Sequence, residues 1–158
     1  MAINKSWLQE LDFTPAGQLY FKAETLAFRR SDEFGHRTCP GVYLWLVSAD
    51  DGYDVLYVGK AGRTLEVRMA QHGSGSRPAS QSKKGLQNAA ELRKYLPDKP
   101  VEVWFRPSEQ VLHLGVQIYQ TSLDEEALLL VLKDEFANGR SLNVLGVSRS
   151  EQKSTSAA

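Results

Sequence analysis

The chain has 158 residues, of which 42% are hydrophobic and 24% are charged, a composition typical of one soluble globular domain. The charges of its 19 basic and 19 acidic residues cancel, so the formal net charge is zero. A net charge of zero argues against a protein that coats nucleic acid without specificity. Cys39 is the only cysteine and no segment approaches the ~20 apolar residues of a membrane span, which excludes an intramolecular disulfide, a multi-cysteine zinc site and a membrane partner.

The first half of the chain predicts an antiparallel hairpin followed by a helix. Residues 18–23 alternate weakly and favour either a strand or an arm packed on the domain edge. Residues 42–47 and 55–58 are rich in β-branched and aromatic side chains, and the Asp-Asp-Gly turn between them predicts a β-hairpin. Thr64 can cap a helix that runs to about His72, because apolar residues alternate with charges there.

The second half predicts two helices separated by strands. Residues 73–84 have the glycine and serine content of a flexible loop, and residues 86–96 form a helical pattern that stops at Pro97. Residues 101–105 alternate as a third strand, and residues 111–119 can add another.

A last helix begins at Ser122 or Asp124 and ends at Asn138-Gly139. Its residues 127–132 are apolar all round, which predicts a buried helix. The fold class is therefore α+β, with a small, mostly antiparallel, three-stranded central sheet flanked by helices and with extra strands possible at both ends. We expect residues 1–39 to be an N-terminal extension, residues 40–147 to be the main domain, and residues 148–158 to be a disordered tail.

Two glycine–tyrosine pairs in this hairpin carry the strongest functional signal. Gly41-Val42-Tyr43 lies on the first strand and Tyr57-Val58-Gly59 on the second, followed at once by Lys60. Arg68 and His72 come next, one helical turn apart, so both can meet the same ligand. This ordered set resembles the GIY-YIG nuclease superfamily, over about residues 40–147.

The resemblance implies a site that hydrolyses a phosphodiester. Tyr43 would be the general base or would orient the attacking water, and Tyr57 would contact phosphate or shape the pocket. A phenol has an unperturbed pKa of ~10, so it needs a neighbouring cation or metal-bound water to work at neutral pH, and Lys60 could supply that cation. Arg68 would clamp a phosphate with its permanently charged guanidinium, and His72 would donate to phosphate or to the leaving group.

The resemblance also implies one Mg²⁺ or Mn²⁺ held by a single carboxylate, with water and phosphate as its other ligands. We prefer Glu126 as that ligand, with Glu125 as the alternative, because apolar residues follow Glu126 three and four positions later. The family also carries an asparagine beyond this helix, which would be Asn143 or Asn138. In the repair enzymes of the family the glutamate precedes the asparagine by a shorter spacing. If Asn143 is that asparagine, this spacing places Val131 where the glutamate belongs.

Substrate contacts are expected from the basic middle of the chain. Residues 60–99 hold nine Lys or Arg against three acids, although counts alone fit a solvated surface as well. Taken singly, each site residue also has a structural interpretation, such as strand packing for the tyrosines and helix capping for His72. The residues that we expect to bind substrate are Gly59, Arg63, Lys83, Lys84 and Asn143, with Arg93 as a further backbone contact.

The composition indicates a cytoplasmic protein, and the resemblance implies a metal-dependent endonuclease that acts on DNA, with RNA not excluded. No DNA-reading motif is visible in the sequence, so recognition would be directed by the structure of the substrate or by a protein partner. Two alternatives stay open: a catalytically inactive nucleic-acid-binding or interaction module on the same fold, and a sequence-specific restriction-type nuclease.

Overall fold

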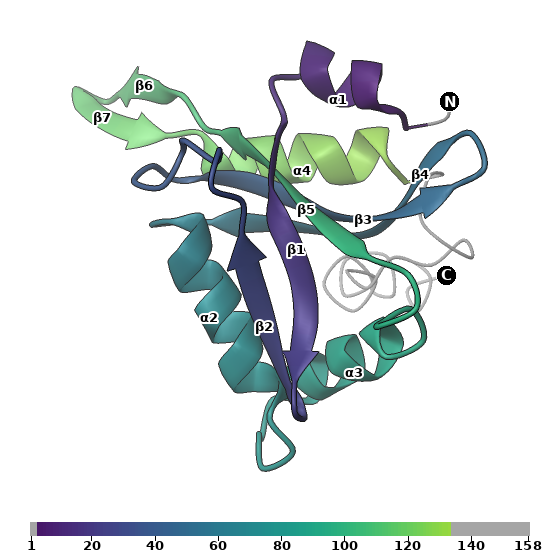
Figure 1. Cartoon of the computed structure of the whole chain (residues 1–158). Helices are drawn as coiled ribbons and strands as arrows, with labels where there is room; N and C mark the ends of the chain where they lie inside the picture. Colours follow the sequence, from purple (N-terminus) through teal and green to yellow (C-terminus); the bar gives the residue numbers. More distant parts are fainter. Residues whose placement is uncertain (1–2, 134–158) are drawn as a thin grey trace, which may run out of the picture.

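A computed structural model of the chain describes residues 3–133 (Figure 1). Its centre is an open five-stranded sheet with the order β2-β1-β5-β3-β4, in which every neighbouring pair is antiparallel. The predicted α+β class is confirmed, but the expected three-stranded sheet is too small. The strands are β1 (Thr14–Lys22), β2 (Thr25–Arg30), β3 (Gly41–Ala49), β4 (Gly52–Ala61) and β5 (Val101–Pro107).

The two additional strands come from the segment before residue 40. Residues 18–23, which favoured a strand or an arm, lie mostly in β1, and β1 pairs with both β2 and β5. Their alternation is weak because β1 does not bury every second residue: Ala16 and Leu19 are its buried side chains. The N-terminal segment therefore shares the central sheet with the tyrosine strands.

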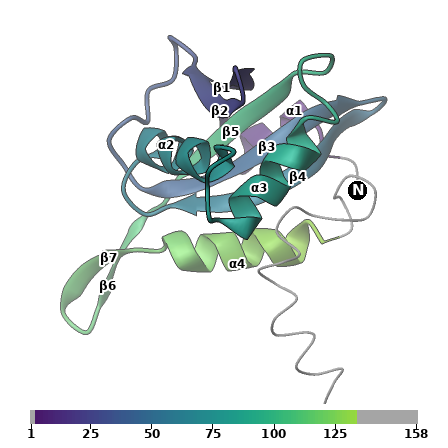
Figure 2. The ribbon, with the colours of Figure 1, turned by 90° about the horizontal axis from the view of Figure 1, so that it is seen from below.

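Helices cover both faces of this sheet (Figures 1 and 2). On one face Leu65, Met69 and Leu92 pack against the inner aromatic residues of β3 and β4. On the other face Leu8 and Leu128 join a second apolar cluster. The helices are α1 (Lys5–Glu10), α2 (Leu65–Ser76), α3 (Lys83–Leu92) and α4 (Thr121–Val131), with α2 and α3 on the first face and α1 and α4 on the second.

The predicted hairpin is confirmed as β3 and β4, and β3 is buried on both of its faces. Alternate side chains of β3 therefore belong to different clusters: Tyr43 and Trp45 to one, Val42 and Leu44 to the other. Tyr43 lies opposite Gly59, and Trp45 lies opposite Tyr57, after which the register shifts. This places both tyrosines on the face that α2 and α3 cover.

The expected loop over residues 73–84 is partly wrong, because α2 continues to Ser76 and α3 begins at Lys83. Packing against β2 favours the longer α2 despite its glycines. Ser76 Oγ donates to the Gly73 carbonyl (2.7 Å) and accepts from the Leu26 amide (2.9 Å), and a Cβ at Gly73 would crowd the Leu26 carbonyl. Ser82 caps α3 by accepting from the Gly85 amide (3.0 Å).

The last described elements depart from expectation in two ways. Residues 111–119 do not join the central sheet but form a separate hairpin of β6 (Gln110–His113) and β7 (Val116–Tyr119). The expectation that residues 127–132 form a buried helix is also wrong, since Leu130 is 68% exposed while Leu128 and Leu132 are buried. The predicted helix end at residues 138–139 and the tail over residues 148–158 lie outside the described residues. None of the helices within residues 3–133 is long and apolar enough to cross a membrane.

Candidate active site

The two tyrosines of the sequence motif lie side by side beneath α2. Tyr43 is fully buried and Tyr57 is 2% exposed, and their rings stack with centroids 5.9 Å apart and planes 16° apart. Gly59 faces Tyr43 across the hairpin, where a Cβ would overlap the Tyr43 ring and hydroxyl. Gly59, expected to bind substrate, thus has a defined part in shaping the site: its missing side chain leaves room for Tyr43.

Helix α2 brings Arg68 and His72 to these tyrosines. Thr64 caps the helix by accepting from the Val67 amide (3.2 Å), and Leu65 and Met69 fix it against the core. The Tyr43 hydroxyl hydrogen-bonds His72 Nε2 at 2.6 Å. The spacing of one helical turn therefore does bring both residues to one place, as expected.

Burial sets the protonation of this hydrogen-bonded pair. Burial, followed by the charges of Arg68 and Lys84, lowers the pKa of His72 to about 3. Burial, followed by Tyr57, raises the pKa of Tyr43 well above its ordinary value, although Arg68 opposes that rise. Both groups are therefore neutral near pH 7, and a neutral imidazole offers one acceptor nitrogen to a phenol hydroxyl.

Arg68 supplies the positive charge beside the two hydroxyls. Burial raises the pKa of Tyr57 as it does that of Tyr43, and the charge of Arg68, together with its hydrogen bonds to the two phenols, opposes both rises. The guanidinium also donates to Gln71 Oε1 (3.0 Å), but its buried Nε has no partner among residues 3–133. Glu66, an alternative partner for Arg68, is held by Arg30 (2.6 Å) and Arg37 (3.2 Å). Within the described residues Arg68 has no paired carboxylate, which leaves it free to receive an anion.

Of the two candidate glutamates, the structure brings Glu125 to this cluster and leaves Glu126 outside it. The Glu125 side chain is 25% exposed, and its Oε1 lies 4.0 Å from Lys60 Nζ. Burial raises the Glu125 pKa, and the charges of Lys60, Lys84 and Arg68 oppose the rise. Glu126 is exposed, and no contact within residues 3–133 joins it to the tyrosines. The preference for Glu126 is therefore not supported by its position.

The helical geometry of α4 explains the difference. The residues three and four positions after Glu125 are the buried Leu128 and the half-buried Leu129. The corresponding residues after Glu126 are Leu129 and Leu130, and Leu130 is 68% exposed. The criterion of apolar residues one turn later thus selects Glu125 once the buried side of α4 is known.

Two lysines complete the surroundings of the cluster. Lys60 Nζ donates to Ser122 Oγ (3.1 Å), which joins the end of β4 to α4. Lys84 Nζ lies 5.9 Å from the centroid of the Tyr57 ring. Both lysines act on the pKa of Glu125, so the predicted Lys60 and Lys84 do lie at the site.

The other predicted contact residues are not brought to the cluster. Arg63 and Lys83 are exposed, and no contact within residues 3–133 links either to the tyrosines. Arg93 lies elsewhere, with its guanidinium 4.6 Å from the Phe21 ring centroid. Asn143 and Asn138 lie outside the described residues.

Two residues of the site were missed in the sequence. The Trp45 ring lies 4.5 Å from that of Tyr57 and 4.7 Å from that of His72. Trp45 follows Tyr43 by two positions in a strand, so the two side chains lie on the same face of the sheet. This spacing could have identified Trp45 as a residue of the site from the sequence. Ser122 precedes Glu125 by three positions in α4, so the two share a helix face.

A metal at this site would have Glu125 as its carboxylate. Residues 3–133 contain no group of three or more His, Cys, Asp or Glu side chains that could hold a metal. A half-buried carboxylate with a raised pKa gains from a nearby cation, and a hard cation can complete its shell with water and phosphate oxygens. The donor set therefore fits one Mg²⁺ or Mn²⁺ bound through a single protein side chain.

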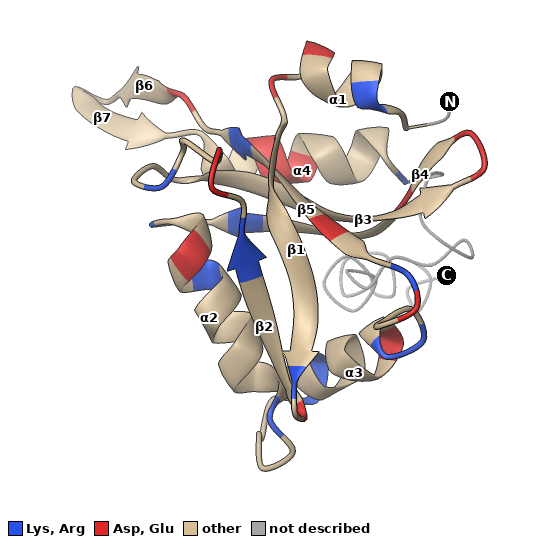
Figure 3. Ribbon diagram, viewed as in Figure 1, with Lys and Arg blue, Asp and Glu red and all other residues tan. Residues whose placement is uncertain are grey.

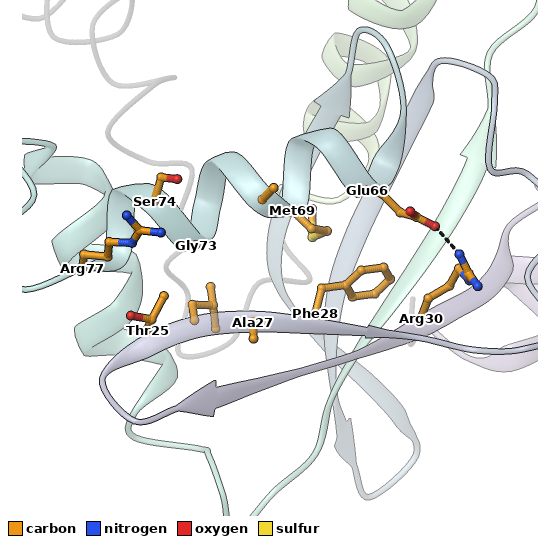
Figure 4. Close-up of a pocket in the computed structure, with 11 residues that line it drawn as sticks. Thr25, Ala27, Phe28, Arg30, Glu66, Met69, Gly73, Ser74 and Arg77 are labelled. Carbon is orange, nitrogen blue, oxygen red and sulfur yellow. Dashed lines mark hydrogen bonds and ion pairs between the residues drawn. The ribbon is translucent and has the colours of Figure 1, made fainter.

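A separate groove of about 490 Å³ lies between α2 and β2 (Figure 4). The Arg30–Glu66 ion pair (2.6 Å) lies at one end and Arg77 at the other. The groove is lined by none of Tyr43, Tyr57, Arg68 or His72. The site therefore rests on the side-chain cluster and not on this groove.

Comparison with known proteins shows a shared fold. No protein-family model and no characterised protein sequence matches the chain. The structure is similar to that of the restriction endonuclease HPY188I in complex with product DNA, with a TM-score of 0.50 and 15% identity over 84% of this chain and 80% of that chain. It is also similar to a mutant of bacteriophage T4 EndoII, with a TM-score of 0.49 and 16% identity over 80% of this chain and 91% of that chain. The likeness to HPY188I shows that this chain has the fold of that endonuclease.

Proposed function

We propose that this protein is a metal-dependent endonuclease of the GIY-YIG superfamily that hydrolyses phosphodiester bonds in DNA. The observation that carries the proposal is the hydrogen bond between Tyr43 and His72 beside Arg68, a cation whose buried Nε has no partner within residues 3–133. The fold shared with HPY188I, an endonuclease described with product DNA, supports the same class of reaction and substrate. The two glycine–tyrosine pairs on adjacent strands support the superfamily.

Arg68 would bind the scissile phosphate. Its guanidinium stays charged at every relevant pH, and its Nε has no hydrogen-bond partner within residues 3–133. Because this Nε is buried, the side chains that cover it would have to move before it could donate to a phosphate oxygen. Tyr57, which shares hydrogen bonding with Arg68, would hold that guanidinium in position. Charge that builds up on the phosphate oxygens in the transition state would then meet fixed donors in a site shielded from water.

Tyr43 and His72 would move the proton of the attacking water. The Tyr43 oxygen would accept a proton from water while the Tyr43 hydroxyl proton passes to His72 Nε2, 2.6 Å away. A phenolate does not have to form in advance, so the high pKa of Tyr43 is no obstacle. His72 is neutral and so has a lone pair on Nε2 for that proton, but the burial and the two cations that lower its pKa also make it a weak base. The proton would therefore have to pass on from His72 as negative charge builds up on the phosphate and the leaving oxygen.

Glu125 would hold one Mg²⁺ or Mn²⁺, which when bound would supply positive charge to the phosphate and the leaving oxygen. Lys60 Nζ lies 4.0 Å from Glu125 Oε1, and its positive charge would keep Glu125 ionised. The hydrogen bond from Lys60 to Ser122 would hold the lysine beside that carboxylate. Lys84 would add to the positive potential that draws the DNA backbone toward the site. Substrate choice would be directed by DNA structure or by a protein partner.

Supercoiled plasmid cleavage in Mg²⁺ tests the proposal. We expect the wild type to nick or linearise the plasmid, and Tyr43→Phe and Arg68→Ala to lose at least about 100-fold in rate, the range of a lost proton-transfer or transition-state contact. Tyr20→Phe is the matched control, because Tyr20 lies on β1 and its ring contacts Arg29 of β2, away from the cluster. Equal cleavage by all four proteins would reveal a contaminating nuclease. A wild type that binds DNA and cuts no plasmid or branched substrate would identify a binding module instead.

A further inference from the structure

Strand β2 is an edge of the central sheet, and part of its outer side has no hydrogen-bond partner within residues 3–133. The Leu26 amide donates to Ser76 Oγ of α2 (2.9 Å), so the backbone groups of Leu26 point away from β1. Backbone groups point the same way at every second residue of an antiparallel strand, so those of Phe28 and Arg30 also point outward. An edge with free amide and carbonyl groups is a template for another extended chain.

Helix α2 closes this edge at Leu26 and leaves it open at Phe28. At Leu26 the helix touches the strand, because a Cβ at Gly73 would lie 2.8 Å from the Leu26 carbonyl oxygen. Next to this contact lies the groove of about 490 Å³ between α2 and β2, a volume within the range of ligand pockets (Figure 4). A chain added beside β2 must therefore end, or turn away, where it reaches Leu26.

The free groups of Phe28 determine which end of an added chain lies at Leu26. In an antiparallel pair, one residue accepts from the Phe28 amide and donates its own amide to the Phe28 carbonyl. The Phe28 amide lies on the side of Leu26 and its carbonyl on the side of Arg30, so such a chain runs toward Leu26 and ends there with its C-terminus. Its last side chain would share the face of Phe28 and enter the groove beside Met69 and Ala70.

Charge favours a carboxylate at this end of the groove. Arg77 lies at the same end as Thr25, and its guanidinium has no partner in the described part of the chain (Figure 4). At the other end, the charge of Glu66 is neutralised by Arg30 (2.6 Å) and Arg37 (3.2 Å), where the basic end of β2 meets the first turn of α2 (Figure 3). A parallel chain would bring its N-terminal ammonium to Arg77, which like charge disfavours. An antiparallel chain would bring its C-terminal carboxylate to this cation.

We propose that the groove between α2 and β2 binds the free C-terminus of a partner protein, which adds as a short antiparallel strand beside β2. The terminal carboxylate would accept from the Phe28 amide and pair with Arg77, and the last amide of the partner would donate to the Phe28 carbonyl. Phe28 offers one donor and one acceptor, whereas phosphate oxygens only accept, so the groove suits a peptide better than DNA. Binding here does not depend on the proposed nuclease activity, because no residue of the tyrosine cluster lines the groove.

Amide NMR of the full-length, nitrogen-15-labelled protein tests this site by titration with peptides. The probes are acetylated hexapeptides of the sequence Ser-Ser-Ser-Thr-Ser-X with a free C-terminus, in which X is Ala, Val, Leu or Phe. We expect at least one of them to bind with a Kd below about 1 mM and to shift the Phe28 amide more than the Ala27 and Arg29 amides, which face β1. The same peptide with a C-terminal amide should bind at least about tenfold more weakly, because it offers Arg77 no negative charge.

A charge reversal locates the carboxylate. Arg77→Glu should weaken binding of the free-acid peptide at least about fivefold. Lys5→Glu makes the same change on α1, on the other face of the sheet, and should leave binding unchanged.

Two results would overturn the proposal on the wild type alone, whether or not the variants fold. One is the absence of a Phe28 shift with all of the peptides at about 5 mM, and the other is equal binding of the acid and amide forms. A Phe28 shift caused by hexathymidylate and by none of the peptides would also overturn it, and would assign the groove to nucleic acid. Plasmid cleavage is not a readout here, so failure of this proposal and failure of the nuclease proposal give different results.

Discussion

Replacing His72 by glutamine should remove a pH dependence of stability that the fold imposes on this imidazole. His72 has a pKa of about 3 in the folded chain, against about 6.5 for a free histidine side chain. The folded state therefore holds the neutral form, while the unfolded chain takes up a proton as the pH falls below about 6.5. The stability tied to neutral His72 is fully present above about pH 6.5 and is lost as the pH falls toward 3.

The size of the effect follows from the two pKa values. Each pH unit between them is worth about 1.36 kcal/mol, so the full difference amounts to at most about 5 kcal/mol. Between pH 7 and pH 5, the part open to measurement, the loss is about 2 kcal/mol. Glu125 has a raised pKa and titrates in both proteins, so a comparison of wild type with His72→Gln cancels its contribution.

Urea unfolding at pH 7 and pH 5 measures this loss. The wild type should lose about 2 kcal/mol more unfolding free energy than His72→Gln over that interval. The ring C–H resonances of His72 should also stay unchanged between pH 8 and pH 5 in an NMR titration. Equal losses in the two proteins, together with a His72 resonance that titrates near pH 6.5, would refute the assignment of a buried, neutral imidazole.

Two paired substitutions test the shape and the charge of the site. Gly59→Ala should lower the unfolding free energy by about 1–3 kcal/mol and abolish cleavage, because the added Cβ would overlap Tyr43. Gly62→Ala is its control, because a Cβ at Gly62 meets nothing within 4 Å. In the same denaturation experiment Gly62→Ala should change the unfolding free energy by less than about 0.5 kcal/mol. Lys84→Ala should lower kcat/KM on plasmid DNA more than Lys83→Ala, since only Lys84 reaches the Tyr57 ring, and equal effects would argue against a specific place for Lys84 at the site.

The hairpin and its tyrosines were predictable because their signals are local. Alternation, an Asp-Asp-Gly turn and a capping Thr64 each act within a few residues, and the structure contains β3, β4 and α2 accordingly. The one-turn spacing of Arg68 and His72 likewise follows from helix geometry alone. These local rules were sufficient to predict the part of the site that β3, β4 and α2 carry.

The choice between Glu125 and Glu126 was not predictable in the same way. Adjacent helix residues point about 100° apart, so the choice depends on which side of α4 faces the sheet. The run from Ala127 to Leu132 gives no direction, because its exposed and buried leucines look alike in the sequence. The pairing of β1 with β5, about 85 residues apart in the chain, is a long-range contact of the same kind that no local pattern encodes.

Plasmid cleavage by Glu125→Gln and Glu126→Gln over a range of Mg²⁺ concentrations tests the central claim most directly. Both changes remove one acid from the same turn of α4, but only Glu125 lies by Lys60 and the tyrosine cluster. We expect Glu125→Gln to lose at least about 100-fold in rate, or to need far more Mg²⁺, while Glu126→Gln cleaves like the wild type. Unimpaired cleavage by Glu125→Gln, with activity lost in Glu126→Gln, would contradict the site described here.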